Sequence, residues 1–280
     1  MLVSTAKLAS HLNDPTWVIF DCRHDLVDHG KGAKLYAESH LPGAHFASVE
    51  TALAGLKNGR NGRHPLPASD QFAAFLAVRG TNKNSQIVAY DDAGGLYAAR
   101  LWWLARWIGF SQVALLDGGW QKWISEGRAV TTEIPVARPN VTTSAPSVDS
   151  RLLWGAVDVL RRLEQSDSLL IDARAGERFR GEVEPMDPVA GHIPGAVNRF
   201  FKANLNSDHT LRPVADLQRE FLSLIGARAV ENVGHSCGSG ITACANIFAM
   251  EYAGLKGSKL YAGSWSEWVS DPSRPVAKGT

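Results

Sequence analysis

The sequence predicts an α/β fold of two tandem domains, each with a mainly parallel sheet flanked by helices. Two observations support this prediction. Short apolar runs alternate with helix-like stretches along the chain, which is typical of parallel sheets that are covered on both faces. Motifs of the first half also recur in the same order in the second half, at a separation too long for a solenoid. The recurring pairs are Asp21-Cys22-Arg23 with Asp172-Ala173-Arg174, His40-Leu41-Pro42-Gly43-Ala44 with His192-Ile193-Pro194-Gly195-Ala196, and residues 116–123 with 261–268.

The elements of the first copy follow from its apolar pattern. Three short apolar runs that each end in aspartate are interpreted as strands. Ser69 is the expected N-cap of a helix that Gly80 ends. A second helix is expected to be buried, because its sequence is apolar nearly all round. The strands are placed at 17–21, 86–91 and 113–117, and the helices at 70–79 and 96–108.

The second copy repeats this alternation, with strands expected at 169–172, 232–236 and 259–262 and a helix at 243–252. Between the copies, residues 133–146 contain three prolines and several small polar residues, which indicates an extended linker. We therefore expect a first domain over 1–135, a linker over 136–147 and a second domain over 148–280.

Composition excludes several classes of function. The chain has 280 residues, of which 45% are hydrophobic and 20% charged, and a formal net charge of +1, so we expect no nucleic-acid partner. No apolar run is long enough to span a bilayer, and the N-terminus lacks a signal-peptide pattern. The three cysteines argue against a disulfide framework and for a reducing, cytoplasmic location. No His/Cys spacing fits a zinc site, and we expect no metal.

The segment from Val233 to Ala243 carries the clearest chemical signal. A short apolar run ends at Cys237, and two glycines then bracket Ser239 before the helix begins. Inward-pointing backbone N–H groups at a helix N-terminus favour a thiolate, and the carboxyl ends of parallel strands are where sites form. Such a nucleophile must be reachable by solvent. The alternative interpretations are a buried structural cysteine and glycines that only make a tight turn.

The two copies differ at this loop. Aligned on the repeat, Asp92 occupies the position of Cys237. A carboxylate cannot act as a sulfur nucleophile, so we expect the second copy to be catalytic and the first to serve as scaffold and one wall of the site.

With these motifs, the chain resembles the two-domain rhodanese superfamily, and within it the 3-mercaptopyruvate sulfurtransferases. The loop Cys237-Gly238-Ser239-Gly240-Ile241-Thr242-Ala243 is similar to their CG[S/T]GVTA motif, with isoleucine for valine. The resemblance implies a Cys237 persulfide formed from a small-molecule sulfur donor and discharged to cyanide or to a thiol such as thioredoxin. It implies no cofactor. The loop N–H groups, at Gly238, Gly240, Ile241 and Thr242 among others, would stabilise the thiolate and the persulfide.

The resemblance also assigns roles outside the loop. Ser239 would join His64 and Glu50 in a proton-shuttling set, although the family has aspartate where Glu50 stands. Arg178 matches the first of two arginines that bind the donor carboxylate. The second is missing, because Met186 follows Glu184-Pro185; Arg180 is a candidate replacement. The alternatives are an ordinary loop histidine at 64 and a surface arginine at 180. Arg174 is interpreted as a structural ion pair and Cys244 as buried.

Donor preference is predicted from charge. The thiosulfate-preferring relatives carry Arg and Lys directly after the cysteine, where this chain has Gly238 and Ser239. The loop therefore lacks the cations that suit a dianion, which predicts 3-mercaptopyruvate as donor, with thiosulfate as the alternative. A cysteine phosphatase would need Cys-x5-Arg, but Ala243 stands at that position. A non-catalytic sulfur-carrier module is the remaining alternative.

Overall fold

Each half of the chain forms a five-stranded sheet in which neighbouring strands are parallel. The computed structural model describes residues 1–136 and 145–280. The first sheet has the order β1 (Leu2–Val3), β5 (Val113–Leu116), β4 (Gln86–Tyr90), β2 (Trp17–Asp21) and β3 (Ala44–Phe46). The second has the order β6 (Leu153–Trp154), β10 (Lys259–Tyr261), β9 (Val233–Ser236), β7 (Leu169–Asp172) and β8 (Val197–Asn198). The corresponding strands occupy corresponding places, so the predicted fold class is confirmed.

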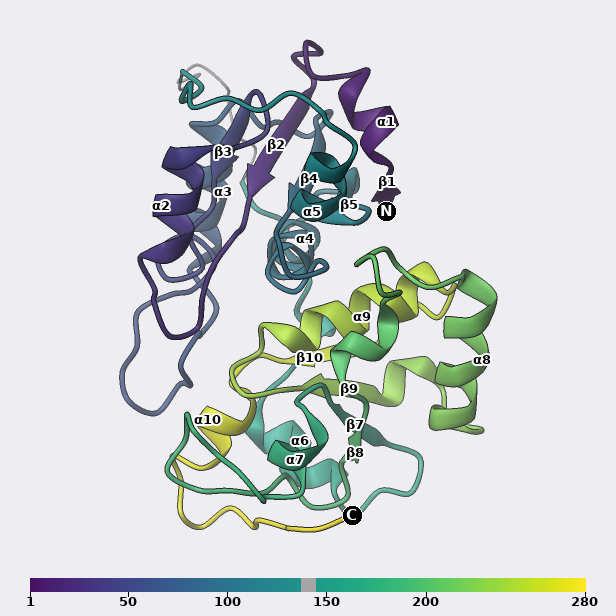
Figure 1. Cartoon of the computed structure of the whole chain (residues 1–280). Coiled ribbons are helices and arrows are strands. Elements are labelled where there is room, and N and C mark those ends of the chain that lie inside the picture. The colour runs from purple at the N-terminus through teal and green to yellow at the C-terminus, as the bar shows by residue number, and fades with distance from the viewer. Residues whose placement is uncertain (137–144) are drawn as a thin grey trace. The chain divides into compact units, whose positions relative to one another are not determined.

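Helices flank both sheets, as Figure 1 shows. Those of the first half are α1 (Thr5–Ala9), α2 (Lys31–Glu38), α3 (Ser69–Ala77), α4 (Ala98–Trp107) and α5 (Gly119–Ser125). Those of the second half are α6 (Ala156–Arg162), α7 (Gly176–Phe179), α8 (Val214–Ile225), α9 (Thr242–Tyr252) and α10 (Ser264–Trp268), with short 3-10 turns at Ser150–Leu152, Phe201–Asn204 and Val230–Asn232. None of the helices in these two described ranges is long and apolar enough to cross a membrane.

The predicted elements agree with the structure except at some ends. All six predicted strands form, with ends that differ by at most one residue. Nine of the ten residues of α4 are buried, as its apolar sequence predicts. The prediction of Ser69 as N-cap of α3 is wrong. Ala68 is the extended residue before that helix, and its carbonyl accepts the first bond, from Phe72 N–H, so no side chain caps the end.

The described residues group into two compact units, one for each sheet. The first contains Met1–Gly55, Leu66–Asp149 and Leu205–Leu211, and the second contains Leu56–Pro65, Ser150–Asn204 and Arg212–Thr280. Nothing in the repeat pattern indicated that each unit includes a short segment from the other copy. The expected linker at 136–147 lies largely outside the described residues, so the predicted boundaries remain a prediction.

An aromatic core fixes the end of the second sheet from which the cysteine loop starts. Four residues of β6, β10 and α10 form its main part, and all are at most 6% exposed: Trp154, Tyr261, Trp265 and Trp268. Trp154 packs directly on β9, since a Cβ on Gly234 would collide with its ring. All four residues of β9 are buried. The strand that leads into the cysteine loop is therefore held on a rigid support.

Candidate active site

The cysteine loop lies between the carboxyl end of β9 and the start of α9, and the start of α10 holds its backbone. Cys237 N–H donates to Ser264 Oγ at 3.0 Å. The backbone N–H groups of Trp265 and Ser266 donate to the carbonyls of Cys237 and Gly238 at 2.9 and 3.0 Å. Ser264 adopts a positive φ of 52°, a costly conformation for a serine. The loop position is thus set by three hydrogen bonds to one neighbouring turn.

The sulfur of Cys237 accepts a hydrogen bond from the loop itself. Gly240 N–H lies 3.1 Å from Cys237 Sγ. Gly240 has a φ of 77°, and a Cβ there would collide with the carbonyl oxygen of Ala262, so only glycine fits. An N–H group directed at sulfur stabilises negative charge on it. Ile241 is the N-cap of α9 and Thr242 its first residue.

The expectation that solvent reaches Cys237 is wrong for this structure, because the residue is only 2% exposed. The backbone of Gly238, the next residue, is not left-handed. A Cβ on Gly238 would lie 2.7 Å from Arg63 Nη2 and 3.6 Å from Arg178 Nη2. Two guanidinium groups therefore lie beside the residue that follows the nucleophile.

Ser239 and His64 lie together, as the resemblance implied. Ser239 Oγ is 2.7 Å from His64 Nδ1, and the two residues are 5% and 4% exposed. His64 belongs to Leu56–Pro65, the segment of the first copy that forms part of the second unit. A buried hydroxyl–imidazole pair two residues from a thiol can move a proton near the reacting atoms.

Glu50, the third expected member of this set, lies in the first unit. Its Oε1 is 3.8 Å from His24 Nε2 and 3.6 Å from His29 Nδ1. Burial lowers the pKa of His24, while the charge of Glu50 opposes that shift. The role of Glu50 in catalysis stays a prediction.

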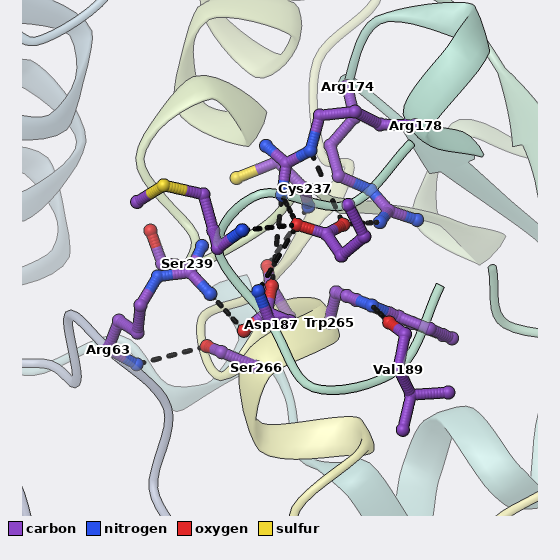
Figure 2. Close-up of polar contacts among 12 residues, drawn as sticks. Arg63, Arg174, Arg178, Asp187, Val189, Cys237, Ser239, Trp265 and Ser266 are labelled. Atoms are coloured by element: carbon purple, nitrogen blue, oxygen red, sulfur yellow. Dashed lines mark hydrogen bonds and ion pairs between the residues drawn. The ribbon is translucent and has the colours of Figure 1, made fainter. Parts of the chain in front are cut away.

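Two arginines of the second copy lie in the same ion-pair network (Figure 2). Arg174 pairs with Asp172 at 2.7 Å and Glu184 at 3.3 Å, and its side chain is 1% exposed, which fits the structural role predicted for it. Arg178 Nη2 is 2.6 Å from Glu184 Oε1 and 3.8 Å from Asp187 Oδ2. Arg178 is 19% exposed and adjoins the loop at Gly238.

Arg180, the candidate second arginine, has a different environment. Its side chain is 41% exposed and its Nε lies 2.6 Å from Glu182 Oε1, a carboxylate that is 55% exposed. This ion pair is a surface contact of the kind that contributes little to stability. A substrate-binding role for Arg180 remains a prediction without support from these contacts.

Sequence reasoning missed Arg63 and Asp187. Arg63 Nη1 bonds to Asp187 Oδ1, and Arg63 N–H donates to Ser266 Oγ at 3.0 Å. Burial raises the pKa of the Asp187 carboxyl, against the opposing effect of Arg63. Only the position of Arg63 directly before His64 could have indicated that it lies near the loop.

The other cysteines differ from Cys237. Cys244 is fully buried, as predicted, and its Sγ donates to Gly240 O at 3.3 Å. Burial raises the pKa of Cys22 well above its ordinary value, and the charges of Asp91 and Asp21 add to the effect. Within residues 1–136 and 145–280, no group of three or more His, Cys, Asp or Glu is placed to hold a metal ion.

The corresponding loop of the first copy is filled by its own carboxylate. Asp91 accepts four backbone hydrogen bonds, at 2.7 to 2.8 Å, from the N–H groups of Ala93, Gly95, Tyr97 and Ala98. The amides of this loop are thus occupied by an internal anion, and Asp92 stands in place of the nucleophile.

Comparisons with known proteins agree with this architecture. A rhodanese-like domain model matches residues 4–126 and 156–271. The chain is 46% identical, over 99% of its length and 98% of the relative's, to a probable 3-mercaptopyruvate sulfurtransferase of Pseudomonas aeruginosa. It is 37% identical, over 100% of its length and 98% of the relative's, to the putative thiosulfate sulfurtransferase SseB of Mycobacterium tuberculosis.

Solved structures give the same result. The 3-mercaptopyruvate sulfurtransferase from Leishmania major matches with a TM-score of 0.83 and 29% identity, over 96% of this chain and 74% of that one. SseA from Escherichia coli, described as a 3-mercaptopyruvate sulfotransferase with the rhodanese fold, matches with a TM-score of 0.80 and 29% identity, over 94% and 98%. Two copies of the domain model, each over four of the five strands of one sheet, place the chain in the rhodanese-like domain family.

Proposed function

We propose that this protein is a sulfurtransferase that moves sulfur from 3-mercaptopyruvate to a thiol or cyanide acceptor through a persulfide on Cys237. The observation that carries this function is the contact between Gly240 N–H and Cys237 Sγ, with the Ser239–His64 pair two residues away. Full-length relatives named 3-mercaptopyruvate sulfurtransferase support it.

In the first step the Cys237 thiolate attacks the sulfur of the donor. A sulfur–sulfur bond forms, and the carbon–sulfur bond breaks with its electron pair going to the pyruvate enolate. The enolate must then take up a proton. The Ser239 hydroxyl, 2.7 Å from His64 Nδ1, is the group placed to deliver it, with the imidazole replacing the proton that the hydroxyl gives up. Pyruvate leaves and the persulfide remains on Cys237.

In the second step an acceptor nucleophile attacks the outer sulfur. The sulfur–sulfur bond breaks, and its electron pair returns to Cys237 as thiolate. Gly240 N–H stabilises the sulfur anion at both stages. We propose a cellular thiol, such as that of thioredoxin, as acceptor. We also propose a cytoplasmic location, since all three cysteines are free and a reducing compartment preserves the thiol.

Thiosulfate is the second candidate donor, and one observation favours it. Although the loop has no cationic side chain at 238 or 239, two guanidinium groups lie beside Gly238. A relative of 37% identity is named a putative thiosulfate sulfurtransferase. The comparison of both donors at equal concentration decides between them.

The test is the mass of Cys237 after treatment with donor. Incubation with 3-mercaptopyruvate is expected to add one sulfur, about 32 Da, to the peptide that contains Cys237. A Cys237→Ser variant should not gain this mass and should not produce sulfide when a thiol is added. The matched Cys244→Ser variant should gain the mass and should produce sulfide. If the Cys237→Ser variant matches the wild type in sulfide release, the protein is not an enzyme of this kind, and a non-catalytic carrier becomes the better interpretation.

A further inference from the structure

Two guanidinium groups converge on the residue after the nucleophile. A Cβ placed on Gly238 would lie 2.7 Å from Arg63 Nη2, and 3.6 and 3.7 Å from the two terminal nitrogens of Arg178. Glycine at 238 therefore leaves room for charge that other parts of the chain supply. Figure 2 shows Asp187 between the two arginines, in agreement with its contacts to both.

The guanidinium groups of Arg63 and Arg178 differ in which of their nitrogens form hydrogen bonds. Glu184 accepts from both Nε and Nη2 of Arg178, at 3.3 and 2.6 Å, and so occupies one edge of that group. Arg63 binds Asp187 through Nη1 alone. Its Nε is buried and has no hydrogen-bond partner in the described part of the chain, and its Nη2 is directed toward Gly238. Nε and Nη2 form an edge that can donate two parallel hydrogen bonds to the two oxygens of a carboxylate.

The backbone around Arg63 fixes this orientation. Arg63 N–H donates to Ser266 Oγ at 3.0 Å, and Ser266 N–H donates to the carbonyl of Gly238 at 3.0 Å. Gly62, with a φ of 83°, packs against Gly263, where a Cβ would approach its carbonyl oxygen to 2.8 Å. One residue of α10 thus fixes the distance between Arg63 and the catalytic loop.

Building on the proposed function, we propose that Arg63 binds the carboxylate of the donor together with Arg178, and so replaces the arginine that the chain lacks at Met186. The three arginines of this network balance its three carboxylates, so the network carries no net formal charge; its members are Arg63, Arg174, Arg178, Asp172, Glu184 and Asp187. The cluster therefore holds no surplus positive charge for a dianion, while the unpartnered edge of Arg63 suits the single carboxylate of 3-mercaptopyruvate.

The experiment compares two donors that share the thiol and the ketone but differ in the carboxylate: 3-mercaptopyruvate and mercaptoacetone. Dithiothreitol serves as acceptor: it takes the outer sulfur of the persulfide, closes to its cyclic disulfide and frees sulfide, which is measured for the wild type and for Arg63→Ala, Arg63→Lys and Arg180→Ala. The matched control is Arg219→Ala, an arginine that is 68% exposed and pairs with Asp216.

For Arg63→Ala we expect the KM for 3-mercaptopyruvate to rise by about 10- to 100-fold, the effect of losing a charged hydrogen-bonded pair. The kcat/KM for mercaptoacetone should change by no more than about twofold. Arg63→Lys should lie between, since lysine keeps the charge but not the two-pronged geometry. The double variant R63A/M186R should recover part of the lost affinity.

An equal loss with both donors would overturn the proposal, because it would mean that Arg63 only supports the fold or the thiolate. A rise in KM for Arg180→Ala but not for Arg63→Ala would also overturn it.

A separate binding experiment tests the carboxylate site independently of the proposed sulfur transfer. Calorimetry measures pyruvate, the carboxylate product, binding to the Cys237→Ser protein with and without Arg63→Ala. A weakened affinity on loss of Arg63 supports the carboxylate site even if no donor is turned over. An unchanged affinity contradicts the site even if the enzyme transfers sulfur.

Discussion

At the scale of single residues, the two glycines of the cysteine loop are required for different reasons. Gly240 needs a positive φ and space beside Ala262, because its N–H must reach the sulfur. Gly238 has an ordinary backbone, and its missing side chain leaves space for the Nη2 end of Arg63. A glycine-rich motif can therefore combine one conformational requirement with one spatial requirement.

His235 is a second residue whose environment has a measurable consequence. It lies on β9, is 0% exposed, and neither ring nitrogen has a hydrogen-bond partner among the described residues. Burial lowers its pKa from 6.5 to about 3, and the charge of Arg199 adds to the shift. The folded protein therefore keeps this histidine neutral at a pH where the unfolded chain protonates it.

We predict that His235 makes the protein less stable as the pH falls from 6.5 toward 3. In that window the unfolded chain binds a proton that the folded chain does not, so the free energy of unfolding decreases by about 1.4 kcal/mol per pH unit. Replacing His235 with leucine removes this contribution. Urea unfolding should show that the wild type loses about 2 kcal/mol more than His235→Leu between pH 7.5 and 5; parallel losses in the two proteins would contradict the assignment.

At the scale of elements, the sequence predicted those whose pattern is local. Central strands such as β2 and β4 are largely apolar runs, because both of their faces are buried. The edge strands β1, β6 and β8 are two residues long and β3 is three, too short to carry a periodic pattern. The sequence repeat could therefore reveal that there are two sheets, but it could not reveal their short edge strands.

The candidate site divides in the same way. Cys237, Ser239 and Gly240 could be identified because they are contiguous in one motif. Arg63 and Asp187 could not, since their meeting depends on the segment Leu56–Pro65 forming part of the second unit. The burial of Cys237 also escaped prediction, because exposure depends on the tertiary packing around the loop and not on the motif itself.

The contacts at the start of α10 lead to a prediction for a Ser266 variant. Ser266 Oγ accepts from Arg63 N–H at 3.0 Å, whereas its own N–H holds the loop. Ser266→Ala removes the first contact and the hydrogen bond that the hydroxyl donates to the carbonyl of Gly263 at 3.2 Å, but it keeps the backbone contact to the loop. We expect a loss of about 1 kcal/mol in the free energy of unfolding, together with a higher KM for 3-mercaptopyruvate.

Ser270→Ala, at the other end of the same segment, is the matched control. Its hydroxyl donates to the carbonyls of Arg60, at 3.4 Å, and Glu267, at 2.7 Å. Among the described residues, the Ser270 hydroxyl forms no hydrogen bond with Arg63 or with the cysteine loop. Steady-state kinetics and thermal unfolding of both variants give the comparison. An effect of Ser270→Ala on KM as large as that of Ser266→Ala would remove the special role of Ser266.

At the scale of the whole molecule, the two copies have sheets with the same strand order, but only the second has a cysteine in the loop after its central strand. The first copy differs in more than the missing cysteine. The Asp91 carboxylate takes four N–H groups of that loop, and burial raises its pKa against those bonds. An internal anion thus stabilises the loop whose equivalent in the second copy serves the sulfur.

We therefore predict that restoring the thiol alone will not restore chemistry. In a Cys237→Ser background, Asp92→Cys should form no persulfide with 3-mercaptopyruvate. The loop amides remain bound to Asp91. Burial raises the pKa of the Asp92 carboxyl, and the negative charge of Asp91 raises it further. Cys22 shows the same effect in the same unit, since burial, Asp91 and Asp21 raise its pKa. Mass spectrometry of the peptide that contains residue 92 measures the outcome.

The informative comparison adds Asp91→Ser, which reproduces the Ser236-Cys237 pair of the second copy. This change frees the loop amides and removes the nearest negative charge, so iodoacetamide at pH 7 should alkylate the introduced thiol faster than in the single Asp92→Cys substitution. The freed amides also lose their acceptor, at a cost of about 1–3 kcal/mol for each that stays buried and unpaired, so circular dichroism must show that the variant is folded. Rapid alkylation of the introduced thiol while Asp91 is still present would mean that the carboxylate does not silence the first loop, and that the difference between the copies lies only in the identity of residue 92.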